Sequence, residues 1–124
     1  IACCNQSVRA VRAPCGLPTT PCAARTMQTL DPGCHSSAYA TDFNLFTGEM
    51  ASLYRGVDVL VIDALRRNPH PTHPHLAQAL DWIESVQPGH TILTHMDHSM
   101  DYRTLRAELP DKVEPGYDGL ELVL

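Results

Sequence analysis

An apolar run at Val57–Ile62 (VDVLVI) limits the folds that this 124-residue chain can adopt. The run is rich in β-branched residues, and a single aspartate interrupts it. A strand that is buried on both faces has this pattern, whereas a strand with one face in solvent alternates apolar and polar residues. The run therefore predicts a central strand of a sheet that is covered on both sides.

Strand and helix patterns alternate on either side of this run. The other predicted strands are Ser37–Thr41, Thr91–Thr94 and Leu120–Leu124. The predicted helices are Gly48–Tyr54, residues 75–86, which Pro88 and Gly89 terminate, and Tyr102–Leu109, with Ser99 or Asp101 near its start. Strands separated by helices indicate an α/β layered domain.

The first 34 residues have a different character. All five cysteines lie there and all seven histidines lie at or after residue 35. The segment carries Pro14, Pro18, Pro21 and Pro32 and shows no helical or strand period. We expect residues 1–34 to be irregular or disordered, and residues 35–124 to form the folded part. No Cys-x-x-Cys pair is present, so unpaired cysteines are favoured over a disulfide framework or a structural zinc site.

Charge and hydropathy exclude several classes of protein. The formal net charge of −5 argues against nucleic-acid binding, because such binding usually needs a basic surface. No apolar run approaches the roughly 20 residues that a membrane span requires. No secretory signal is recognisable, so a cytoplasmic location is expected. The chain begins with Ile1 rather than methionine, which suggests a fragment.

Three predicted strands each lead directly into a residue that can bind a metal or move a proton: Asp42, Asp63 and His95. If the strands are neighbours, these side chains converge at the carboxyl edge of the sheet, where open α/β sheets bind ligands. Carboxylate and imidazole ligands suit zinc or manganese. Other roles remain open: a turn or helix cap for Asp42, a hydrogen bond to the next loop for Asp63, and a core position for His95.

The stretch from Asp63 to Leu76 (DALRRNPHPTHPHL) contains three prolines and three histidines. Proline stiffens a loop, and a stiff loop at the edge of a sheet can hold one imidazole in place for acid–base work. A solvent-exposed connection that happens to contain histidines is the alternative.

Four segments in order, YATDFN, VLVIDALRRNPHPTHPHL, ILTHMDHSMDYRTLRAELP and VEPGYDGLEL, resemble the C-terminal half of a metallo-β-lactamase-fold hydrolase. In particular they resemble the phosphoribosyl cyclic phosphate phosphodiesterase family, which is related to ribonuclease Z. The resemblance covers residues 35–124. It implies part of a four-layer αββα sandwich, incomplete in this chain.

The resemblance also implies roles for particular residues. Asp42 matches the aspartate that bridges two metal ions, and His95 matches the last histidine ligand. The two are expected to face each other across neighbouring strand tips. His73 matches a histidine that protonates the leaving oxygen of the phosphodiester. Three further residues are expected to contact substrate or to hydrogen-bond to the metal ligands: Asp63, Arg66 and His98.

The principal ligand signature of that family, H-x-H-x-D-H, does not occur in the chain. We therefore expect the intact enzyme to bind two divalent metal ions, zinc or manganese, and to cleave a small phosphodiester, a cyclic phosphoribosyl phosphate. This chain alone is expected to be nearly inactive, because a metal site needs its full set of ligands. Two alternatives remain: a metal-free, non-enzymatic fragment or interaction module, and a ribonuclease Z-like RNA-processing nuclease. Association into a homodimer is a further expectation.

Overall fold

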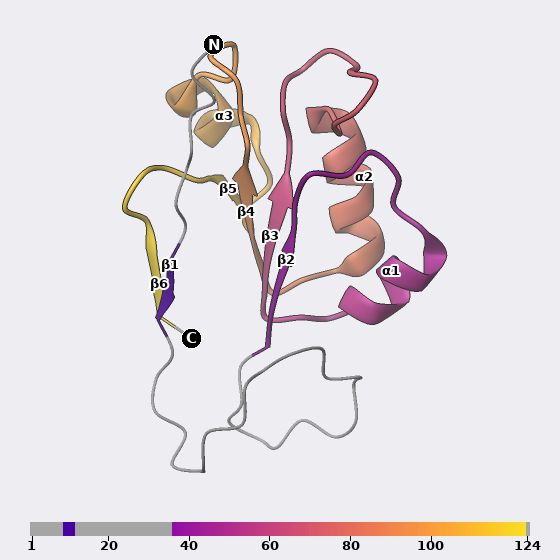
Figure 1. Ribbon diagram of the computed structural model, residues 1–124. Coiled ribbons are helices and arrows are strands. Elements are labelled where there is room, and N and C mark those ends of the chain that lie inside the picture. Colours follow the sequence, from indigo (N-terminus) through magenta and orange to yellow (C-terminus); the bar gives the residue numbers. More distant parts are fainter. Residues whose placement is uncertain (1–8, 12–35, 124) are drawn as a thin grey trace.

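Four parallel strands form the main sheet in the computed structural model, which describes residues 9–11 and 36–123 (Figure 1). The strand order is β2-β3-β4-β5, so neighbours in the sheet are also successive strands in the sequence. The strands are β2 (Ser37–Ala40), β3 (Val59–Asp63), β4 (His90–Thr94) and β5 (Val113–Pro115). Because all four are parallel, their carboxyl ends lie at one edge.

Each connection between these strands contains a helix. The helices are α1 (Gly48–Tyr54), α2 (Leu76–Val86) and α3 (Tyr102–Glu108). Thr47 caps α1 by accepting a hydrogen bond from the Met50 N–H, and Asp101 caps α3 by accepting one from the Thr104 N–H. Helix α2 ends at Gln87, which adopts a left-handed conformation in front of Pro88.

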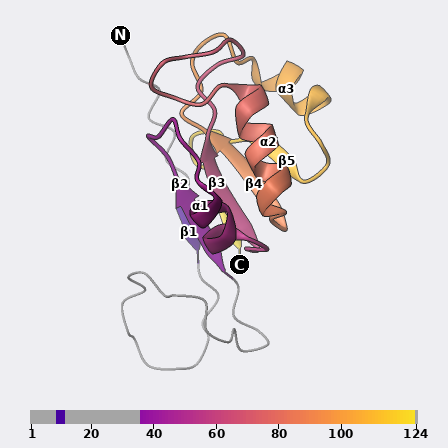
Figure 2. The ribbon, with the colours of Figure 1, turned by 90° about the vertical axis from the view of Figure 1, so that its right-hand side faces the viewer.

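The sheet is covered on both faces, as the apolar run at 57–62 predicts. Leu60, Ile62 and Leu93 point to one side, where α2 packs against them with Ile83 and Val86. On the opposite side, a smaller cluster joins Val61 and Ile92 to Leu120, with Leu122 packed against it. That side carries the pair β1 (Arg9–Val11) and β6 (Glu121–Val123), which run parallel to each other. Figures 1 and 2 show the resulting layers: helices α1 and α2, the four-stranded sheet, and the β1–β6 pair.

The α/β fold with its central buried strand is confirmed, and each helix and strand predicted after residue 35 is present to within a few residues. Strand β5 was missed, because its three residues Val-Glu-Pro are too few to show a period and proline is rare in strands. Arg9–Val11 is an exception to the irregular chain predicted before residue 35, since it pairs with β6 through backbone hydrogen bonds. The rest of that prediction falls on residues outside the described ranges. Within the described ranges, no helix is long and apolar enough to cross a bilayer.

Gly89 lets the chain pass close to the backbone of Asp58, the residue just before β3. A Cβ atom at this position would lie 2.8 Å from the backbone oxygen of Asp58. We expect Gly89→Ala to lower the free energy of unfolding by about 1–3 kcal/mol, as overpacking against rigid backbone does. Urea denaturation followed by circular dichroism measures this change. Gly48→Ala is the matched control, because a Cβ atom there meets nothing within 4 Å. Equal stability of the two variants would contradict the steric reason.

Candidate metal centre

Asp42, Asp63 and His95 come to the same edge of the sheet. Asp63 is the last residue of β3 and pairs with Thr94 of β4, so His95 lies one residue beyond it. Asp42 lies two residues beyond Ala40, which pairs with Ile62. The three residues are thus level with one another at the carboxyl edge, as the sequence predicts.

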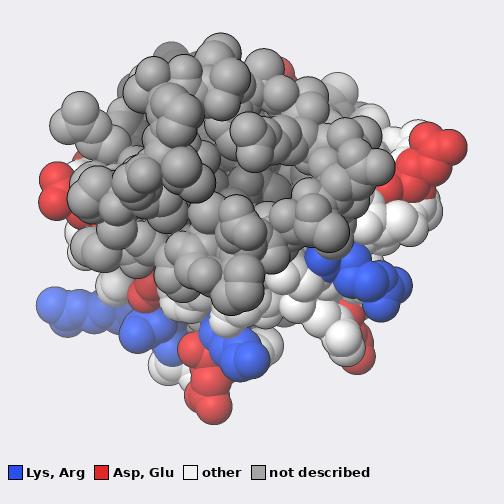
Figure 3. All heavy atoms as spheres, turned by 90° about the horizontal axis from the view of Figure 1, so that it is seen from below, with Lys and Arg blue, Asp and Glu red and all other residues white. Residues whose placement is uncertain are grey.

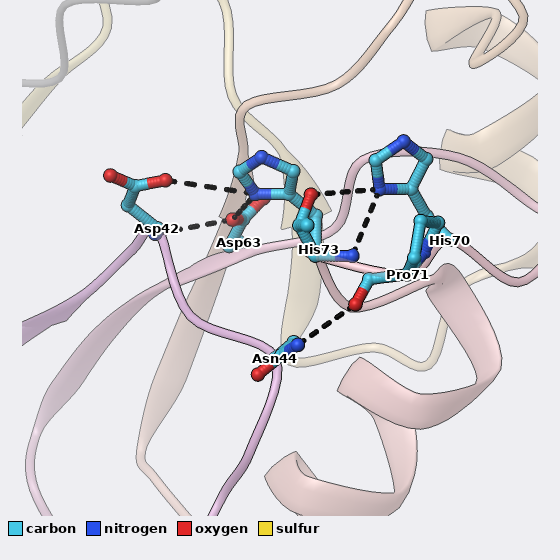
Figure 4. Close-up of polar contacts among 7 residues, drawn as sticks. Asp42, Asn44, Asp63, His70, Pro71 and His73 are labelled. Atoms are coloured by element: carbon cyan, nitrogen blue, oxygen red, sulfur yellow. Dashed lines mark hydrogen bonds and ion pairs between the residues drawn. The ribbon is translucent and has the colours of Figure 1, made fainter.

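Asp63 is the buried centre of this arrangement (Figure 4). Its Oδ2 atom accepts a hydrogen bond from the Asp42 N–H at 3.2 Å and lies 3.1 Å from Nδ1 of His73. Its Oδ1 atom is buried, with no hydrogen-bond partner among the described residues. Burial raises the pKa of the Asp63 carboxyl group, and the contact with His73 and the charge of His95 offset part of this effect. Oδ1 is therefore a polar atom whose burial is not compensated by a protein donor.

His73 reaches the edge from the proline-rich loop between β3 and α2. Two backbone hydrogen bonds close this loop, from the Leu65 N–H to the Pro74 carbonyl and from the Leu76 N–H to the Arg66 carbonyl. The imidazole of His73 stacks on that of His95, with ring centroids 4.7 Å apart. Because the ionised Asp63 carboxylate can only accept, the contact between them favours a proton on Nδ1 of His73 and leaves Nε2 for other partners.

The backbone is strained at two of these positions. Asp42 has φ 63° and His95 has φ 59°, values in the left-handed region that side chains other than glycine seldom adopt. The other such residue among the described non-glycine positions is Gln87, which ends a helix. Strain of this kind costs about 1–3 kcal/mol per residue and tends to persist where a site requires it. The two residues that the sequence predicts as metal ligands are thus held in unusual conformations at the ends of β2 and β4, on either side of β3.

The donor set fits a divalent metal ion. Asp63, His73 and His95 each offer one ligand atom, and these atoms lie within 4.8 Å of one another. Asp42 adds a carboxylate whose Oδ1 is 3.9 Å from Nδ1 of His73 and whose side chain is 83% exposed. One buried carboxylate oxygen without a partner, two imidazoles and an open carboxylate are ligands that zinc and manganese accept.

Two of the sequence-predicted residues are not part of this group. Arg66 donates to the backbone oxygens of Asn68 and Pro69 and so stabilises its own loop. His98 is exposed in the turn after β4, beside Asp97. A substrate contact for either residue stays a prediction.

One detail of the sequence prediction is corrected. Asp42 and His95 do not lie on neighbouring strand tips, because β3 separates β2 from β4. Asp63, at the end of β3, lies between them and contacts the backbone of Asp42 directly. A role for Asp63 in hydrogen bonding to the adjoining loops, which the sequence left open, is confirmed by these contacts.

Sequence reasoning missed Asn44, whose side chain joins two of the loops at this edge. Its Nδ2 atom donates to the Pro71 carbonyl at 2.9 Å. The only signal in the sequence is its place two residues after Asp42, which does not identify a partner 27 residues away.

Comparison with known proteins agrees with this architecture. Residues 2–96 match the beta-lactamase superfamily domain, a range that includes most of the segment before residue 35. The structure is similar to a crystal structure of a new diphosphatase from the PhnP family, with a TM-score of 0.67 and 36% sequence identity. That similarity covers 69% of this chain and 34% of the diphosphatase chain.

A curated protein from Porphyromonas gingivalis (strain ATCC BAA-308 / W83), named octanoyltransferase, is 32% identical over 89 residues. The match covers 70% of this chain and 18% of the octanoyltransferase. This chain therefore spans about a third of its structural relative and less than a fifth of its curated relative.

Proposed function

The chain belongs to the beta-lactamase superfamily, and we propose that it forms the part of a metal-dependent hydrolase that binds and protonates a phosphodiester. The observation that carries this proposal is the buried Asp63 carboxylate, with an unpartnered Oδ1, beside His73 and His95. The similarity to a diphosphatase of the PhnP family supports a substrate that contains phosphate.

In this proposal His95 and Asp42 hold metal. Asp63 holds the Asp42 backbone and the His73 imidazole in place. Bound divalent ions would supply an activated water and neutralise the charge of the phosphoryl group. The ligand assignment follows the family resemblance at Asp42 and His95. The left-handed backbone at both residues supports it, because that conformation turns the chain sharply at the strand end. Asp63 orients His73 and the Asp42 backbone through one oxygen.

His73 is the proposed general acid. Asp63 engages Nδ1 of this imidazole, so Nε2–H is the proton that can be donated. The recipient is the departing ribose oxygen of the phosphodiester. The side chain of His73 is 18% exposed, which limits its access to bulk water while leaving it at the edge of the sheet.

A small substrate is favoured over RNA. We propose a cyclic phosphoribosyl phosphate, in keeping with the family resemblance. A net charge of −5 does not favour binding of a nucleic-acid backbone. Figure 3 shows the end of the molecule opposite to the candidate metal centre, where basic and acidic side chains both lie along the lower margin.

The test uses Mn²⁺, because manganese prefers oxygen and nitrogen ligands and the five cysteines would compete for zinc. We expect the chain to bind Mn²⁺ weakly, and His95→Ala to weaken binding at least about tenfold, as loss of a direct ligand does. Isothermal titration calorimetry measures the affinity. His98→Ala is the matched control, since this exposed histidine lies three residues away and outside the ligand group.

The reaction class is tested with dimethyl phosphate in the presence of Mn²⁺. Its ³¹P resonance should broaden more with wild-type protein than with His95→Ala, because Mn²⁺ at the site brings a paramagnetic ion next to the phosphorus. Equal broadening with both proteins would contradict a phosphate site at this metal centre. Wild-type affinity for Mn²⁺ equal to that of His95→Ala would contradict the metal centre itself.

A further inference from the structure

The loop between β2 and α1, which carries Asp42, is fastened to the rest of the molecule by side chains. Within residues 9–11 and 36–123, no backbone-to-backbone hydrogen bond outside the helices and strands involves residues 43–46. The neighbouring β3–α2 loop, which carries His73, is closed by two such bonds. The position of Asp42 relative to His73 therefore depends on how the first loop is attached to the second.

Asn44 makes a polar attachment in addition to the bond from the Asp42 N–H to Asp63 Oδ2. Its side-chain amide donates to the Pro71 carbonyl across the gap between the loops (Figure 4). Asn44 lies two residues after Asp42, and Pro71 lies two residues before His73. This bond of 2.9 Å thus runs beside the 3.9 Å contact between Asp42 Oδ1 and His73 Nδ1.

Two aromatic rings make the apolar attachment. Phe43 and Phe46 both stack on Trp82 of α2, with ring centroids 5.3 Å and 5.2 Å apart and interplanar angles of 21° and 19°. Helix α2 continues directly from the loop that carries His73. Both kinds of attachment therefore join the Asp42 loop to the same unit, β3–α2.

From this arrangement we infer that Asn44 is a positioning residue for the metal centre, holding Asp42 against His73 through Pro71. That Asp42 is held there to bind metal rests on the proposed function. That Asn44 holds the loop rests on the hydrogen bond to Pro71. Asp42 is strained at φ 63°, so a loop without this bond has a path to relax away from the centre. The phenylalanine rings keep the loop near α2, and the amide bond fixes its place along the edge.

The first test is amide hydrogen exchange at Asp42, whose N–H is bonded to Asp63 Oδ2. In Asn44→Ala, exchange at this amide should rise about two- to five-fold, the factor expected for one partly exposed hydrogen bond. Exchange in the centre of β3, for example at Leu60, should not change. NMR on the 124-residue chain measures both sites together, which separates a local opening from general destabilisation.

Two further variants sharpen this test. Asn68→Ala makes the same chemical change in the β3–α2 loop at an exposed asparagine whose side chain forms no hydrogen bond in the described structure. It should leave exchange at Asp42 unchanged. Asn44→Gln keeps the amide donor on a side chain one methylene longer and should restore part of the protection. Equal exchange at Asp42 in wild type and Asn44→Ala would overturn the inference, as would equal increases in Asn44→Ala and Asn68→Ala.

Mn²⁺ affinity supplies the second readout. Asn44→Ala should weaken binding about two- to five-fold if Asp42 is a ligand that the bond positions. Failure of wild-type protein to bind Mn²⁺ would count against the proposed function, and the exchange measurement would still decide the role of Asn44. Weaker binding without a change in Asp42 exchange would overturn the positioning role.

Discussion

The Asp63→Asn variant is expected to bind Mn²⁺ about 10 to 100 times more weakly than wild type while keeping its fold, the usual effect of removing a group that supports metal ligands. The substitution preserves the shape of a fully buried side chain. It removes the negative charge that Oδ1 presents beside His73 and His95. In the wild-type chain Oδ2 accepts from the Asp42 N–H and contacts Nδ1 of His73. The one amide oxygen of asparagine can keep both of these contacts.

Stability should respond in the opposite sense to metal affinity. Burial raises the pKa of Asp63, which means that the folded chain disfavours the charged carboxylate at this position. A neutral amide avoids that cost, so the midpoint of urea denaturation without metal should be unchanged or higher. Asp81→Asn, the same change at an exposed position of α2, is the control for both measurements. Unchanged Mn²⁺ affinity in Asp63→Asn would show that Asp63 has no part in the site.

The largest loss of stability is expected for Leu60→Ala. Leu60 lies in the middle of β3, is fully buried and belongs to the cluster beneath α2. Removal of a buried leucine side chain leaves a cavity and costs about 2–5 kcal/mol of unfolding free energy. That amount is a large fraction of the about 5–15 kcal/mol by which a domain is usually stable, so the urea concentration at the unfolding midpoint should fall sharply.

Leu53→Ala is the matched control for Leu60→Ala, because Leu53 is 49% exposed on α1. We expect it to change the free energy of unfolding by less than about 0.5 kcal/mol. Urea denaturation followed by far-ultraviolet circular dichroism compares the two variants. Similar losses in both would show that β3 is not the centre of the core.

The sequence was most informative where burial alone determines the structure. The run at 57–62 predicts β3, and the spacing of Leu76, Leu80 and Ile83 predicts α2, because both patterns reflect which side chains must leave water. Strand β5 escaped this reasoning, since Val113–Pro115 forms through pairing with β4 rather than through a pattern of its own. Pairing partners distant in the sequence leave no local signal.

The candidate site was predictable in part for the same reason. Asp42, Asp63 and His95 follow strands, so their convergence needs only that the strands be adjacent and parallel, which they are. The position of His73 against Asp63 depends on how a proline-rich loop folds back over 10 residues, and the residues alone left open whether that loop approaches the site. The left-handed conformations of Asp42 and His95 are compatible with these residue types but not required by them.

The hydrogen-bond partner of Asn44 could not be predicted from the sequence. An asparagine after a strand has many local hydrogen-bonding options, and turns are the commonest of them. Its actual partner is a carbonyl on another loop, and the loop of Asn44 is also held by the stacking of Phe43 and Phe46 on Trp82. Such a contact follows from tertiary packing and cannot be read from the residue type.

Binding of a divalent metal ion at the carboxyl edge of the sheet can be seen in an anomalous difference map from crystals grown with Mn²⁺. A peak is expected within direct coordination distance of the His95 imidazole and of a carboxylate oxygen of Asp42. The opposite end of β4 offers an internal comparison, where His90 Nε2 and Glu114 Oε1 lie 2.8 Å apart. A peak there with none beside His95, or no peak at either end of β4, would show that the carboxyl edge is not a metal centre.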